Sequence, residues 1–137
     1  MSIKSVYKKI RFCVRDVFHN KKQRNSLRNS NFSLITSDCT GGCVAKDLKV
    51  RMNSPTRNFY FNADDYIKFC KNLDYYLTLQ PELYTGNYSG GGSEYLMASL
   101  GDLKMFLVHF SSVGQCRDEW VRRRGRVKKG NKFFVKK

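Results

Sequence analysis

The 137-residue sequence lacks any apolar run near the roughly 18 to 20 residues that cross a bilayer. Its first residues alternate apolar with basic side chains, so they do not form the apolar core of a secretory signal. We therefore expect neither a transmembrane nor a secreted protein, and a reducing cytoplasm is its natural location.

Metal-binding and disulfide patterns are also missing. The five cysteines are scattered at positions 13, 39, 43, 70 and 116, an odd number without a close pair of pairs. This arrangement suits neither a disulfide framework nor a four-thiolate zinc site. The two histidines, His19 and His109, are far apart and complete no recognisable ligand set. We expect no metal site and no cofactor.

Acidic residues are scarce, with 11 Asp and Glu against 26 Lys and Arg, and the net charge is +15. The excess of bases lies at the two ends, because residues 1–30 hold nine bases and one acid and residues 121–137 hold nine bases and no acid. Residues 31–120 therefore hold eight bases and ten acids, a net charge of −2. The middle of the chain gives no electrostatic reason to expect nucleic acid as a partner.

Apolar residues are plentiful, at 41% of the chain, which is enough to bury a core. We expect a basic amphipathic helix and linker over residues 1–30 and a single α/β domain over residues 31–137. The helix has apolar residues at steps of three and four, at Ile3, Val6, Tyr7, Ile10, Cys13, Val14, Val17 and Phe18. Such a stripe can dock on the domain, lie on an anionic membrane surface or accompany polyanion binding.

The domain opens with a pattern typical of an α/β unit. Residues 32–36 predict a buried strand, residues 37–42 a turn of small residues, and residues 43–48 a short helix. Further along, the pattern predicts a short strand at 59–61, a helix capped by Asn62 and ended by Pro81, and a hairpin turning at Gly101-Asp102. A helix over 113–127 and a strand at 131–135 follow.

The turn after the first strand is the strongest candidate site. In open α/β sheets ligands bind beyond the carboxyl ends of the strands, and glycines let backbone amides approach a phosphate at a helix N-terminus. The candidate anion or sugar ligands are Ser37, Asp38, Thr40, Gly41 and Gly42, and Asn53, Ser54 and Thr56 add hydroxyl or amide contacts. The alternative is that the glycines only make a tight turn.

Two further groups carry possible chemistry. Cys39 is a candidate nucleophile with His109 as its base and Asp102 or Asp38 as the orienting carboxylate, although a small buried cysteine is the plainer interpretation. Arg123, in a run of arginines, can bind phosphate through bidentate contacts or belong to a solvated basic helix face.

Several segments in order resemble a bacterial family of exopolysaccharide or capsular polysaccharide biosynthesis proteins whose activity is unassigned. The matching pieces are FSLITSDCTGG at 32–42, NSPT at 53–56, ADDYIKF at 63–69, NLDYYL at 72–77, Gly101-Asp102 leading to FLVHF, and Trp120 with RRRGRV. The resemblance implies a Rossmann-like open sheet with flanking helices. The chain departs from the family at Thr40 and Phe110, and it is shorter at its C-terminal end.

These observations lead to one main expectation and two alternatives. The main expectation is a transferase of surface-polysaccharide biosynthesis that binds a nucleotide sugar or sugar phosphate, with His109 as a base and the basic ends near the inner membrane face. One alternative is a non-enzymatic module that binds polyanions or membrane surfaces through its ends. The other is a Cys39-dependent acyltransferase or hydrolase.

Overall fold

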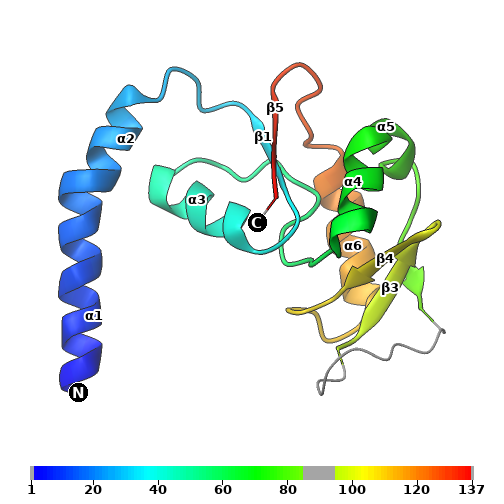
Figure 1. Ribbon diagram of the computed structural model, residues 1–137, viewed down its shortest axis with the longest axis horizontal. Coiled ribbons are helices and arrows are strands. Elements are labelled where there is room, and N and C mark those ends of the chain that lie inside the picture. Colours follow the sequence, from blue (N-terminus) through cyan, green and yellow to red (C-terminus); the bar gives the residue numbers. More distant parts are fainter. Residues whose placement is uncertain (1, 85–94, 137) are drawn as a thin grey trace.

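The computed structural model describes residues 2–84 and 95–136, which form a mixed α/β fold (Figure 1). Strands β1 (Ser33–Thr36) and β5 (Lys132–Val135) pair in parallel, with Ser33 opposite Lys132 and Thr36 opposite Val135. Strands β2 (Glu82–Leu83), β3 (Met97–Leu100) and β4 (Leu103–Phe106) form an antiparallel sheet. The α/β class predicted from the sequence is confirmed.

A long helical segment stands beside this body at the N-terminus (Figure 1). It consists of α1 (Ile3–Val14), a π-helical stretch η1 (Arg15–Asn20) and α2 (Lys21–Ser26). The predicted amphipathic helix is therefore present, and the helical segment continues to Ser26, which leaves only the last few of residues 1–30 for the predicted linker. The apolar stripe does not dock on the body, because no residue of α1 is buried.

The first α/β unit forms at the predicted place with one shift of boundary. The helix α3 (Thr40–Leu48) begins earlier than expected, so Gly41 and Gly42 lie in its first turn and not before it. Cys39 is the residue that precedes the helix, and the prediction of a turn extending to Gly42 is wrong by about three residues.

The extended residues 59–61 join the two sheets. The Phe61 amide donates to the Ser37 carbonyl at the end of β1 over 2.9 Å, while Tyr60 and Phe106 of β4 exchange both of their backbone hydrogen bonds. The aromatic triplet predicted a short strand at 59–61, whereas the structure has a single β-bridge there, between Tyr60 and Phe106. Tyr66 bridges the parallel strands β1 and β5, because its hydroxyl lies 2.7 Å from the Ile35 carbonyl oxygen and 2.9 Å from that of Val135.

The predicted helix that follows Asn62 is present, but it is broken. Helix α4 (Ala63–Lys71) is capped by Asn62, whose side-chain oxygen accepts from the Asp65 amide over 2.8 Å. Asn72 interrupts the helix with φ −124° and ψ 37°, and α5 (Leu73–Tyr76) follows. The break turns Tyr76 back onto the core instead of continuing a straight helix to Pro81.

The predicted hairpin is β3–β4, which turns at Gly101 with φ +62°, a backbone conformation that favours glycine. The second strand ends at Phe106, so the apolar residues up to Phe110 belong to the following turn.

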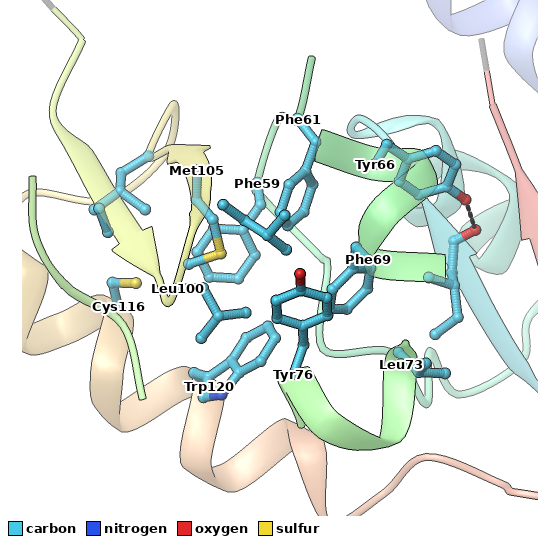
Figure 2. Packing of buried hydrophobic residues seen from close by; sticks show 14 residues of the cluster. Phe59, Phe61, Tyr66, Phe69, Leu73, Tyr76, Leu100, Met105, Cys116 and Trp120 are labelled. Atoms are coloured by element: carbon cyan, nitrogen blue, oxygen red, sulfur yellow. Dashed lines mark hydrogen bonds between the residues drawn. The ribbon is translucent and has the colours of Figure 1, made fainter. Parts of the chain in front are cut away.

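The core lies between this hairpin, helices α4 and α5, and helix α6 (Val113–Arg124) (Figure 2). Trp120 is fully buried against Phe59 and Phe69, and its indole N–H donates to the Leu79 carbonyl over 2.9 Å. Phe69 also stacks on Phe61 with ring centroids 5.3 Å apart. This aromatic cluster holds residues 59–61 in place and thereby fixes the end of β1.

Candidate functional site

The turn between β1 and α3 holds a carboxylate at the start of the helix. The Thr40 amide donates to Asp38 Oδ1 over 2.8 Å, and the Thr36 hydroxyl donates to the Asp38 carbonyl over 2.7 Å. These bonds fix Asp38 beyond the carboxyl end of β1, the place where open α/β sheets bind ligands. Because Asp38 itself compensates the positive end of α3, the turn suits sugar hydroxyl groups better than a bare phosphate.

Ser37 is 5% exposed, and its backbone forms hydrogen bonds with the neighbouring strand residues. Its amide donates to the Val135 carbonyl over 3.2 Å and its carbonyl accepts from Phe61. Ser37 therefore ties the candidate turn to β5 on one side and to residues 59–61 on the other.

The two glycines of the turn have different surroundings. A Cβ atom added at Gly41 would lie 2.7 Å from Thr36 Cγ2 and 2.8 Å from Thr36 Oγ1, whereas nothing lies within 4 Å of one added at Gly42. Gly41 is needed for the close approach of α3 to β1. Gly42 has no such packing role, and its partly exposed position leaves it accessible to a ligand.

The side chains of Asn53, Ser54 and Thr56 are buried and bonded within the fold. The Thr36 amide donates to Thr56 Oγ1 over 3.1 Å, and that hydroxyl lies 3.0 Å from Ser54 Oγ. The Asn53 side-chain amide donates to the Phe32 carbonyl over 3.3 Å. These groups brace β1 from the loop after α3, so they position the turn and do not offer the hydroxyl contacts expected of them.

Cys39 is half-buried at the start of α3. Burial raises the pKa of its thiol, and the neighbouring Asp38 and Cys43 raise it further. A nucleophilic thiol needs the opposite shift, which neighbouring cations normally supply. The surroundings of Cys39 therefore favour the inert thiol.

His109 and Asp102 lie at opposite ends of β4. His109 is exposed in the turn after the strand, and Asp102 precedes the strand in the hairpin turn. The four residues of β4 extend about 13 Å at the usual rise and lie between the two turns that carry these groups. Asp102 accepts from the Tyr76 hydroxyl over 2.8 Å, a bond that holds its pKa below the ordinary value. Asp102 therefore does not orient His109.

Arg123 serves the fold from within α6. It is 8% exposed, donates to the Arg57 carbonyl over 2.8 Å and pairs with Glu119 on its own helix. Burial lowers its pKa. The neighbouring Arg124 donates to the carbonyls of Leu77, Thr78 and Leu79. Arg124 thus anchors the turn after α5 and Arg123 the loop at Arg57, so neither the phosphate site nor the solvated face predicted for Arg123 describes its position.

A basic cavity of about 270 Å³ lies at the amino ends of the parallel strands. It is lined by Ser30, Asn31, Lys49, Val50, Arg51, Asn53 and Lys128. Lys49 has a left-handed backbone with φ 54° at the end of α3. Sequence reasoning missed this cavity because its three bases come from two distant segments, and no local pattern marks them.

The described residues contain no cluster of three or more His, Cys, Asp or Glu side chains arranged to hold a metal ion. Likewise, no described helix has both the length and the apolar composition needed to span a bilayer.

Comparison with known sequences assigns the chain to a family. Residues 10–137 match the family described as "Domain of unknown function (DUF1919)". The chain belongs to the DUF1919 family. An "Uncharacterized protein" of Haemophilus influenzae (strain ATCC 51907 / DSM 11121 / KW20 / Rd) is 31% identical over 118 residues, which are 86% of this chain and 55% of that relative. The chain therefore spans about half the length of this relative.

The DUF1919 match includes the turn at 37–42, the bracing loop and the basic cavity. It begins within α1 at Ile10, so residues 3–9 of the helix lie outside it. Neither the DUF1919 description nor the relative's name states an activity, and the assignment to polysaccharide biosynthesis stays a prediction.

Proposed function

We propose that the chain is a cytoplasmic transferase of cell-surface polysaccharide biosynthesis that binds the sugar of a nucleotide sugar or sugar phosphate at the turn after β1. The proposal treats β1, residues 37–39 and α3 as the opening unit of a Rossmann-like sheet. The observation that carries it is the Asp38 carboxylate, fixed by the Thr40 amide at the carboxyl end of β1. A carboxylate held there accepts hydrogen bonds from adjacent sugar hydroxyls.

The remaining residues of the site take supporting roles in this proposal. Gly42 leaves room above the first turn of α3, and Ser54 and Thr56 hold β1 so that Asp38 keeps its position. His109 is exposed in the turn after β4 and is the candidate general base for an acceptor hydroxyl. The family resemblance supplies the substrate class.

Isothermal titration calorimetry of the chain against a panel of nucleotide sugars and sugar phosphates tests the proposal. Asp38→Asn keeps an acceptor for the Thr40 amide but removes the charge, so it should weaken binding of the preferred sugar by roughly 10- to 100-fold. Asp64→Asn is the matched control, because Asp64 is an exposed acid in the first turn of α4, a helix of the same length. If no sugar ligand binds, or if both variants bind as tightly as the wild type, the proposal fails.

The Cys39-dependent alternative predicts a different result in a simpler experiment. If Cys39 is the nucleophile, its thiol should react with iodoacetamide faster than the exposed thiols of Cys13 and Cys43. The raised pKa of Cys39 predicts the reverse order, with Cys39 reacting more slowly than either. Mass spectrometry of tryptic peptides at short labelling times separates the two, and Cys39→Ser should leave sugar binding unchanged.

A further inference from the structure

Helix α1 exposes its whole apolar stripe. Ile3 is 87% exposed, Ile10 57% and Phe18, one turn beyond α1, 75%. The stripe consists of Ile3, Val6, Tyr7, Ile10, Val14, Val17 and Phe18, with the exposed Cys13 beside it. Single exposed apolar side chains are ordinary, but a continuous row of them along one helix marks an interaction surface.

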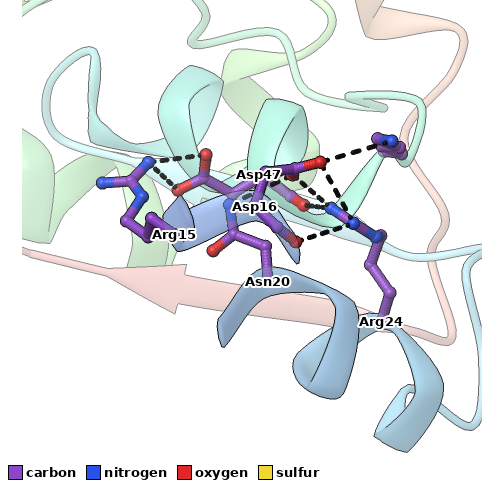
Figure 3. Close-up of polar contacts among 6 residues, drawn as sticks. Arg15, Asp16, Asn20, Arg24 and Asp47 are labelled. Atoms are coloured by element: carbon purple, nitrogen blue, oxygen red, sulfur yellow. Dashed lines mark hydrogen bonds and ion pairs between the residues drawn. The ribbon is translucent and has the colours of Figure 1, made fainter. Parts of the chain in front are cut away.

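The body holds this helical segment by its other face (Figure 3). Arg15 forms two hydrogen bonds with the Asp47 carboxylate, at 2.7 and 2.8 Å, and Arg24 donates to the Asp47 carbonyl. Asp16 pairs with Arg24 over 2.7 Å, and Lys46 of α3 lies over the Phe12 ring at 5.3 Å. At about 100° per residue, Ile10 lies roughly opposite Phe12 around the helix axis. The apolar stripe therefore points away from the body.

Other positions of α1 carry bases that have no acidic partner in the described residues. Lys4, Lys8, Lys9 and Arg11 form no ion pair with any part of the chain that the structure describes. The first acid of the sequence is Asp16, whose carboxylate is already paired with Arg24 and Lys49. The exposed part of the helix is thus apolar on one face and purely cationic beside it.

The charge pattern of α1 indicates which kind of surface can cover the stripe. Two copies of α1 packed stripe to stripe would bring the same unpaired bases together without any acid to balance them. An anionic lipid surface offers acyl chains to the apolar side chains and phosphate groups to the flanking lysines. We propose that α1 lies in the surface of an anionic membrane through its Ile3–Phe18 stripe, while its opposite face holds the body. This inference does not depend on the sugar bound by the body.

Flotation of the full chain with vesicles tests this inference. Vesicles of phosphatidylcholine and phosphatidylglycerol in equal parts should carry the chain upward, and vesicles of phosphatidylcholine alone should not. Ile10→Asp puts a charge into the stripe and should weaken binding by about tenfold or more, given the loss of one buried isoleucine side chain. Ser5→Asp is the matched control, because Ser5 is exposed on the opposite face of α1, and it should change binding by less than about threefold.

Both substituted residues are exposed on a helix that buries no residue, so neither variant should unfold the body. Failure to float with the anionic vesicles would overturn the inference. Equal weakening by the two variants would overturn it as well, because binding would then follow charge alone. A dimer detected by light scattering and dissociated by Ile10→Asp would assign the stripe to a second copy of the chain instead.

Discussion

Helices α1 and α4 have similar sequence patterns, but α1 is exposed and α4 is packed in the core. Both place apolar residues at steps of three and four and carry lysines on the remaining positions. Helix α4 buries Tyr66 and Phe69 in the aromatic core, whereas α1 buries nothing. The periodicity of an apolar stripe therefore predicts a helix in both cases, but it does not predict what covers the stripe.

The charges around the two stripes account for the difference. Helix α4 begins with Asn62, Asp64 and Asp65, and Asp65 accepts from the Lys104 amide of β4, so its polar groups have partners in the body. Helix α1 has no acid in its first turn, and its stripe is bordered by unpaired bases. Helix α4 therefore has the polar partners of a core helix, and α1 has the charge pattern on which we base its proposed contact with an anionic surface.

The largest effect should come from the core that receives α4. Trp120→Ala removes a fully buried side chain and its hydrogen bond to Leu79, so it should lower the free energy of unfolding by about 3–5 kcal/mol. Urea denaturation followed by circular dichroism measures this loss. A loss below about 1 kcal/mol would mean that the aromatic cluster does not organise the body.

The two glycines of the candidate turn give the next largest contrast. Gly41→Ala forces α3 away from Thr36 and should destabilise the chain by about 1–3 kcal/mol, whereas Gly42→Ala should leave stability unchanged or raise it by up to about 1 kcal/mol. Thermal unfolding of both variants measures the difference. Equal midpoints for the two variants would contradict the close packing of α3 on β1. Gly42 is therefore the position at which a larger side chain tests ligand binding without disturbing the fold.

The junction of η1 with α2 should lose stability in acid. Hydrogen bonding to Arg24, above all, lowers the pKa of Asp16 to about 2 from its ordinary 3.8. A carboxyl group whose pKa is lower in the folded protein than in the unfolded chain stabilises the folded state at pH values above its ordinary pKa. This contribution is lost as the pH falls from 3.8 toward 2. The protection of the η1 and α2 amides, measured against their intrinsic exchange rate at each pH, should fall over that range. In Asp16→Asn this protection should already be lower than in the wild type at pH 7, and unchanged protection at pH 7 would contradict the role of the Asp16–Arg24 pair.

The smallest effect should come from the stripe of α1. Ile10→Ala should change the free energy of unfolding by less than about 0.5 kcal/mol, because the side chain is exposed and touches no core residue. The same denaturation experiment as for Trp120→Ala measures it. A loss of 2 kcal/mol or more, on the scale of buried aliphatic truncations, would show that the stripe is covered by the chain itself.

The sequence predicted the local elements of the body well. Asn62 as a cap, Gly101-Asp102 as a hairpin turn and the strand at 131–135 are all confirmed, because each depends on a few neighbouring residues. The break at Asn72 was missed, since the apolar spacing continues through it and only the packing of Tyr76 and Leu73 on the core reveals it.

The candidate site was harder to predict, because side-chain direction depends on tertiary contacts. Asp38 lies just before the N-terminus of α3, in the turn where the sequence placed it. The hydroxyl groups of Ser54 and Thr56, which were expected to contact a ligand, instead form hydrogen bonds that hold β1. The basic cavity joins Lys49 and Arg51 to Lys128, and that meeting follows from the parallel pairing of β1 with β5. No pattern within either segment marks it.

We propose that the body binds the sugar while α1 binds the membrane, and hydrogen–deuterium exchange of the full chain tests both interactions together. Anionic vesicles should slow amide exchange in residues 3–18, which have few tertiary contacts to protect them, and leave residues 37–42 unchanged. A bound nucleotide sugar should slow exchange at residues 37–42 and leave α1 unchanged. Protection of the body by vesicles, or no protection of α1, would contradict this division of binding between α1 and the body.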